Sequence, residues 1–159
     1  MQNKPLISIL IVAYNPWEYL RNTLKSCLDQ THQNTEILIL DNNSSEDISE
    51  SITGLQDYRI TDRNEDRNET IFSLCETVEL WNCRTVKLIK IDKNIGPYRG
   101  LNLLLEQAKW DYIAIQDHDD IWHREKLQKQ VEFLESHPEY IGCGTNTIMY
   151  YEADQKYFE

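Results

Sequence analysis

Short apolar segments that stop abruptly at polar residues recur along this chain of 159 residues, and they limit the folds open to it. The first, Ile7–Ala13, is apolar except for Ser8, which is typical of a strand buried on both faces of a parallel sheet. Similar runs occupy Ile37–Leu40, Val86–Ile91 and Tyr112–Ile115. Helical spacing of apolar residues follows each run, so we expect an α/β fold: a mainly parallel, Rossmann-like sheet flanked by helices.

The helices can be placed by their capping residues and apolar spacing. Asn15 can cap a first helix that has Pro16 in its opening position. Ser44, with Asp47 three residues later, can cap a short second helix that runs to about Gly54. Three further elements are expected: a helix over 101–108, a helix over 127–134 and a fifth, more exposed strand over 141–151.

Residues 55–84 interrupt this alternation and are long for a connection in an α/β fold. The segment opens with the charged run Asp57–Glu69 and then becomes more apolar. We interpret it as a charged insertion, either a solvated loop or a segment with a short helix or hairpin at 71–81. Residues 1–159 otherwise have the length and composition of a single domain.

Charge and composition exclude several classes of partner. A net charge of −11 argues against binding a nucleic-acid backbone or an anionic membrane surface. No apolar stretch approaches the length of about 20 residues needed to span a bilayer. The four cysteines show no spacing typical of a metal site, and we expect free thiols in a reducing, cytoplasmic compartment.

Polar residues follow the carboxyl end of each of the four expected buried strands. In open α/β sheets, ligands bind beyond these ends, near a switch in strand order. If the strands are parallel, all four groups lie at one edge of the sheet and form a candidate active site. The groups are Tyr14 and Asn15, Asp41 and Asn42, Asn94 and Gly96, and Asp117 to Asp120.

The cluster Asp117-His118-Asp119-Asp120 carries three carboxylates, which raise one another's pKa unless a cation lies among them. A divalent metal that also carries phosphate oxygens would supply that cation. Capping of the next helix explains one or two of these acids, with Asp120 the best candidate. Asp41 either ends its strand or accepts the ring N–H of a pyrimidine, and Gly96 suits a turn with positive φ.

Four segments, in the same order and at the same strand ends, resemble the family 2 glycosyltransferases, which have the GT-A fold. The opening strand Ile7–Asn15 is similar to that of the family, and Leu40–Ser45 is similar to its second-strand motif. Asn94–Pro97 with Asn102 resembles the N-x-G…RN element, and Asp117–Leu127 resembles the DxDD-x-W-x-P-E-K-L block. The resemblance runs from about Pro5 to Tyr140, with residues 55–84 as a gap.

The resemblance implies transfer of a sugar from a nucleotide-diphosphate sugar, commonly a UDP-sugar, to a glycan or lipid-linked acceptor in polysaccharide biosynthesis, usually with inversion. It implies Mg²⁺ or Mn²⁺ held by Asp117 and Asp119, and contact between Asp41 and the base. The implied nucleotide-binding residues are Ala13, Tyr14, Asn15, Asp41, Asn42, Asn94, Gly96, Arg99, Asn102, Asp117 and His118.

The sequence departs from the family pattern in three places. Leu101 stands where the family has arginine, with Arg99 two residues earlier, and Arg124 stands where the family has proline. No recognisable base motif follows Asp120. We therefore expect the donor-binding portion of a longer enzyme, which would be inactive alone. The acceptor region and the catalytic base would lie elsewhere in the longer protein, which could also associate peripherally with the membrane. The alternative is a non-catalytic nucleotide-sugar-binding or scaffold domain.

Overall fold

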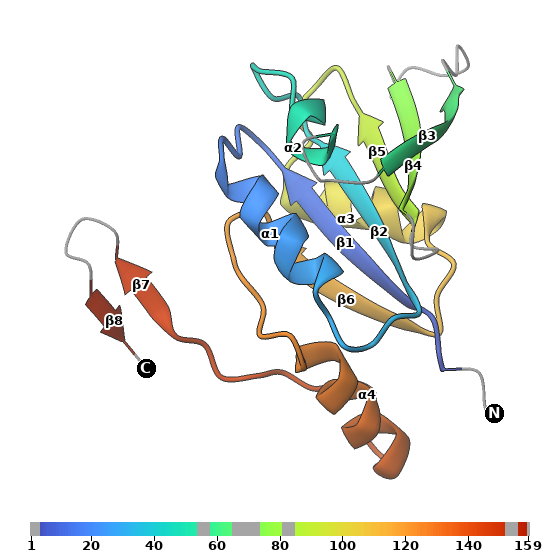
Figure 1. Ribbon diagram of the computed structural model, residues 1–159, viewed down its shortest axis with the longest axis vertical. Coiled ribbons are helices and arrows are strands. Elements are labelled where there is room, and N and C mark those ends of the chain that lie inside the picture. The colour runs from blue at the N-terminus through green and yellow to red at the C-terminus, as the bar shows by residue number, and fades with distance from the viewer. Residues whose placement is uncertain (1–3, 54–57, 65–73, 81–84, 152–155, 159) are drawn as a thin grey trace.

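A six-stranded sheet forms the centre of the computed structural model, which describes residues 4–53, 58–64, 74–80, 85–151 and 156–158 (Figure 1). The strand order is β3-β4-β5-β2-β1-β6. The strands are β1 Ile7–Ala13, β2 Thr35–Asp41, β3 Tyr58–Asn64, β4 Leu74–Leu80, β5 Thr85–Lys90 and β6 Tyr112–Asp117. The helices are α1 Tyr19–Leu28, α2 Ser49–Thr53, α3 Pro97–Gln107 and α4 Lys126–Ser136. A separate two-stranded sheet joins β7 Met149–Tyr151 to β8 Lys156–Phe158.

The four strands predicted from the apolar runs form the parallel part of the sheet. Strand β1 pairs in parallel with β2 on one side and with β6 on the other, and β2 pairs in parallel with β5. The chain thus builds outward from β1 through β2 to β5, and then returns to the far side of β1 to form β6. This reversal is the switch in strand order at which open α/β sheets bind ligands.

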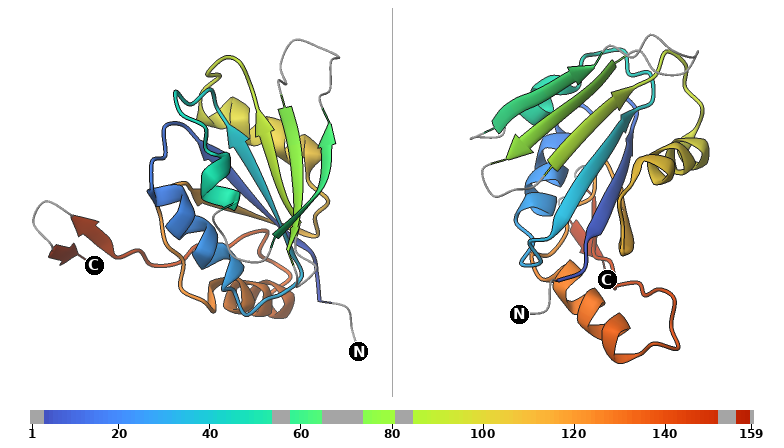
Figure 2. Two further views of the ribbon diagram at one scale, coloured as in Figure 1. Left: turned by 45° about the horizontal axis from the view of Figure 1, so that its top comes forward. Right: turned by 90° about the vertical axis from the view of Figure 1, so that its right-hand side faces the viewer.

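Helices cover both faces of the parallel strands, which explains why β1 is apolar along its whole length (Figure 2). Ile7, Ile9 and Ile11 pack in one buried cluster with residues of α1, α2 and α4. Leu10, which points to the opposite face, packs in a second cluster with Leu104 of α3. The right-hand view of Figure 2 shows α1 and α2 on one side of the sheet and α3 on the other.

Two of the expected helix starts are wrong. Helix α1 begins at Tyr19 rather than directly after Asn15, because the backbone takes positive φ at Asn15 (48°) and Trp17 (45°). Asn15 caps nothing, and its Oδ1 instead accepts hydrogen bonds from the backbone N and the Oγ of Ser45. Helix α2 begins at Ser49, whose N–H donates to Asp47 Oδ1, so Asp47 and not Ser44 serves its first turn.

The expectations for the insertion and the last strand need correction too. Strands β3 and β4 pair antiparallel and extend the sheet beyond β5, so part of the charged run 57–69 is a strand and not a solvated loop. The hairpin alternative had the right kind of structure but placed it at 71–81, of which 71–73 and 81 lie outside the described residues. Of the strand expected at 141–151, only Met149–Tyr151 forms, and it stands away from the main sheet (Figure 1).

None of the described helices is both long enough and apolar enough to cross a bilayer.

Candidate active site

The carboxyl ends of the parallel strands lie in register and bring the predicted residues to one edge. Ala13 at the end of β1 is paired with Asp41 of β2, and Val12 is paired with Asp117 of β6. Neighbouring strands lie about 4.8 Å apart, so Asp41 and Asp117 flank the end of β1 at close range. The prediction that these residues share an edge is confirmed.

Asp41 is buried at this edge and organises the loop that follows it. Its Oδ1 accepts the backbone N–H of Ser44 at 2.8 Å. Ser44 Oγ in turn accepts the backbone N–H of Asn15 at 3.0 Å, which ties this loop to the one after β1. Tyr14 lies in the same β1 loop and is half exposed. One oxygen of Asp41 thus holds the loop, and the residue lines a hollow at this edge of the sheet.

Asn42 and Asn94 act together as a brace for the start of α3. The buried amide of Asn42 donates to Asn94 Oδ1 at 3.1 Å and accepts the N–H of Ile95 at 2.9 Å. Asn94 Oδ1 also accepts the N–H of Gly96, whose φ of 81° confirms the expected left-handed turn. These amides shape the loop, and Arg99 is exposed in the first turn of α3 that the loop leads into. Asn102 lies one turn further along, also exposed.

Two adjoining hollows lie between the loops after β1, β2 and β5. One is lined by Asn15, Trp17 and residues 44–48, and the other by Asp41, residues 43–47 and residues 90–92. Lys90, which the sequence pattern did not indicate, donates to Asp47 Oδ1 there. This bond, together with the backbone N–H of Ser49, lowers the pKa of Asp47 to about 2. The signal available in the sequence was its position, since Lys90 ends β5 as Asp41 ends β2.

The acidic cluster lies on the other side of β1 and borders neither hollow. Asp117 ends β6, and both Asp117 and Asp119 are exposed. Burial, followed by the charges of Asp117 and Asp119, raises the pKa of Asp120, while His118 opposes the shift. The His118 ring lies at the same edge, with Nδ1 3.3 Å from the carbonyl oxygen of Val12.

Asp120 does not cap the next helix, contrary to expectation, because α4 begins six residues later and its N-cap Glu125 makes no side-chain capping bond. Among the described residues, no group of three or more His, Cys, Asp or Glu side chains is arranged to hold a metal alone. Asp117 and Asp119 can supply two exposed carboxylates, so a metal at this position would need further oxygens from a bound ligand or water, as Mg²⁺ commonly takes from phosphates.

Comparison with known proteins agrees with this geometry. The model of the family described as glycosyl transferase family 2 matches residues 8–74 and 73–157. The chain belongs to this family. The family 2 chain is 32% identical over 131 residues to "UDP-Glc:alpha-D-GlcNAc-diphosphoundecaprenol beta-1,3-glucosyltransferase WfaP" from Escherichia coli. The match covers 82% of this chain and 42% of that protein.

Solved structures share the GT-A fold of this family 2 chain. TarS 1-349 from S. aureus in complex with UDP matches with a TM-score of 0.62 and 19% identity, over 92% of this chain and 39% of that one. The mannosyltransferase PcManGT from Pyrobaculum calidifontis, in complex with GDP-Man and Mn²⁺, also matches with a TM-score of 0.62. The sequence identity is 17%, and the match covers 84% of this chain and 33% of that one. The chain spans less than half the length of the curated relatives it matches.

Proposed function

We propose that this family 2 chain is the donor-binding part of a glycosyltransferase that uses a nucleotide-diphosphate sugar, specifically a UDP-sugar. The observation that carries the proposal is the parallel register at the switch between β1 and β6, which pairs Asp41 with Ala13 and Asp117 with the neighbouring Val12. This register puts the buried carboxylate of Asp41, suited to a base, and the exposed carboxylate of Asp117 on opposite sides of the end of β1, with the exposed Asp119 two residues further along.

The base of the donor is assigned to the hollow beside Asp41, where a carboxylate oxygen accepts the ring N–H of uracil. Asn15, in the loop after β1, lines the adjoining hollow, and Asn42 and Asn94 hold the loop that leads into α3. Arg99 and Asn102 lie on the exposed face of α3, with Arg99 nearer the positive end of the helix dipole, which favours phosphate. The structures of TarS in complex with UDP and with UDP-GlcNAc support this choice of donor.

The diphosphate is assigned to the side of β1 that carries Asp117 and Asp119, with His118 beside it. These two carboxylates would hold Mg²⁺ or Mn²⁺, and a bound metal neutralises charge on the diphosphate leaving group. The Mn²⁺ present with GDP-Man in the mannosyltransferase structure supports a metal here. The acceptor is proposed to be lipid-linked or a glycan, by likeness to the diphosphoundecaprenol substrate in the name of WfaP, with inverting transfer.

Replacing Asp119 with asparagine should remove the dependence of UDP binding on Mn²⁺. We expect the wild-type chain to bind UDP at least about 10-fold more tightly with Mn²⁺ than without it, because the metal would join the diphosphate to the Asp117 and Asp119 carboxylates and a 10-fold gain needs only about 1.4 kcal/mol. Asp119→Asn should bind UDP with nearly the same affinity in both conditions. Isothermal titration calorimetry of UDP, with and without Mn²⁺, measures both values.

Asp111→Asn is the matched control, since this exposed carboxylate accepts the N–H of Leu6 at the opposite edge of the sheet. It should keep the full Mn²⁺ effect. Equal UDP affinity in all three proteins, indifferent to Mn²⁺, would refute the metal assignment. UDP and metal binding without any transfer to a lipid-linked acceptor by the longer protein would favour the non-catalytic alternative.

A further inference from the structure

Three buried polar residues on the α1 side of the sheet face the segment that follows β6. Thr23 and Ser26 lie in α1, and Gln30 follows two residues after its end. All three are almost fully buried, with exposed fractions of 0%, 6% and 0%. Their spacing of three and then four residues is that of one helix face. The segment they meet, residues 118–127, runs alongside α1 from the end of β6 to the start of α4 (Figure 1).

Every one of these side chains binds the main chain of that segment, and the contacts follow the same order along both stretches. Thr23 Oγ1 lies 2.9 Å from the carbonyl oxygens of both His118 and Asp120. Ser26 Oγ accepts the N–H of Trp122 at 3.1 Å. We call Thr23, Ser26 and Gln30 the polar ladder.

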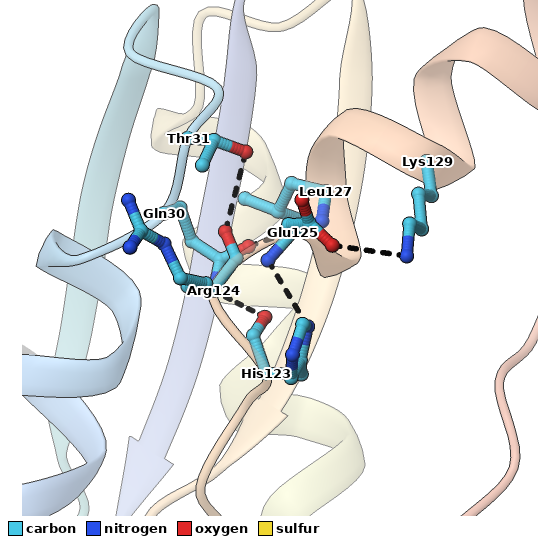
Figure 3. Close-up of polar contacts among 7 residues, drawn as sticks. All are labelled: Gln30, Thr31, His123, Arg124, Glu125, Leu127 and Lys129. Carbon is cyan, nitrogen blue, oxygen red and sulfur yellow. Dashed lines mark hydrogen bonds and ion pairs between the residues drawn. The ribbon is translucent and has the colours of Figure 1, made fainter.

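Gln30 holds the far end of the segment with both ends of its amide (Figure 3). Its Nε2 donates to the carbonyl oxygen of His123 at 2.9 Å, and its Oε1 accepts the N–H of Leu127 at 3.0 Å. Next to it, the N–H of Thr31 donates to the carbonyl oxygen of Arg124 at 2.8 Å. Because these partners are backbone groups, the ladder fixes the path of the chain whatever side chains the segment carries.

Thr23, the first residue of the polar ladder, binds the turn that carries the candidate metal ligands. The single hydroxyl proton of Thr23 is shared between the carbonyl oxygens of His118 and Asp120, the residues before and after Asp119, so the main chain on both sides of this carboxylate is held against α1. Gln116 Nε2 adds a second donor to the Asp120 carbonyl at 2.7 Å. A buried hydroxyl or amide without a hydrogen bond costs free energy. The segment is therefore most stable in the position in which it satisfies the hydrogen bonds of the polar ladder.

We propose that Thr23, Ser26 and Gln30 are positioning residues that set the geometry of Asp117 and Asp119 for the metal. The inference rests on the proposed function, since it gives the ladder a role only if these carboxylates hold a metal with the donor. Supporting residues around a metal site typically change metal affinity by roughly 10- to 100-fold when removed. Thr23 should contribute most to metal affinity, because its hydroxyl contacts the carbonyl groups of both residues next to Asp119.

Thr23→Val removes the hydroxyl with little change of shape, and Thr23→Ser restores it. Thr35→Val is the matched control, since Thr35 is also buried and its Oγ1 has no hydrogen-bond partner among the residues that the structure describes. UDP is titrated calorimetrically into each 159-residue protein with and without Mn²⁺, and urea unfolding verifies that each is folded. Thr23→Val should lose roughly 10-fold in the Mn²⁺-dependent part of UDP affinity and little without Mn²⁺.

Thr23→Ser and Thr35→Val should retain the Mn²⁺ effect, and Ser26→Ala should reduce it less than Thr23→Val does. Hydrogen exchange provides a readout without ligand: the amide of Trp122 should exchange faster in Ser26→Ala than in Thr35→Val. A full Mn²⁺ effect in Thr23→Val, or an equal loss of UDP affinity with and without metal, would overturn the positioning role. If the wild type and Asp119→Asn bind UDP alike with and without Mn²⁺, the metal assignment of the proposed function fails, and the inference with it.

Discussion

Replacing Asp41 with asparagine should weaken UDP binding by roughly 10- to 100-fold, the cost of leaving a buried polar group unpaired. One oxygen of Asp41 already accepts the N–H of Ser44 at 2.8 Å, and the proposed site uses the other for the ring N–H of uracil. An asparagine offers one acceptor and one donor to these two N–H groups. In either orientation, its amide nitrogen faces another donor. Calorimetric titration of UDP into the variant measures the loss.

The same substitution should improve binding of CDP relative to UDP, because the ring nitrogen of cytosine at this position is an acceptor. Asp111→Asn, at the opposite edge of the sheet, controls for the general effect of removing one negative charge. Unchanged discrimination between UDP and CDP in Asp41→Asn would remove Asp41 from the base site, whatever else binds at this edge.

Gly100→Val should destabilise the fold by about 3 kcal/mol, at the upper end of the usual cost of overpacking a core. Gly100 lets α3 approach the sheet closely: a Cβ at this position would lie 2.8 Å from Leu40 Cδ2 and 3.0 Å from both γ carbons of Val12. The leucine is fully buried, and the β-branched valine is stiff, so neither can move away at low cost. Urea unfolding at neutral pH measures the change in the free energy of unfolding.

Gly142→Val is the control for the Gly100 experiment, since a Cβ at Gly142 meets nothing within 4 Å. It should change the free energy of unfolding by no more than about 0.5 kcal/mol. Equal destabilisation by both substitutions would mean that the close approach of α3 does not depend on Gly100.

The parallel core could be predicted because its apolar pattern has a single structural explanation. Residues 7–13 are apolar without alternation since α1, α2 and α4 cover one face of β1 and α3 covers the other. The position of the candidate site could be predicted from the strand ends, because parallel strands that end in polar residues place those residues at one edge of the sheet. The register then places Asp41 beside Ala13 and Asp117 beside Val12, on the two sides of the end of β1.

The errors came where tertiary contacts override local signals. Asn15 looks like a helix cap, yet its side chain binds Ser45 of the neighbouring loop and its backbone adopts φ of 48°. The residues of β3 read as a charged loop because edge strands are solvated and tolerate charge. The polar ladder was missed for a similar reason: Thr23, Ser26 and Gln30 resemble the solvent face of an amphipathic helix until residues 118–127 are seen to cover them.

The central claim is that a nucleotide diphosphate and a divalent metal bind at the carboxyl edge of β1, β2 and β6. Paramagnetic broadening of amide NMR signals by Mn²⁺, in the presence of saturating UDP, locates the metal directly. The account predicts that broadening centres on residues 117–119 and extends across the strand end to residues 13–15. Broadening centred on Leu6, Asn34 and Asp111, at the opposite edge, or broadening without any preferred location, would contradict it.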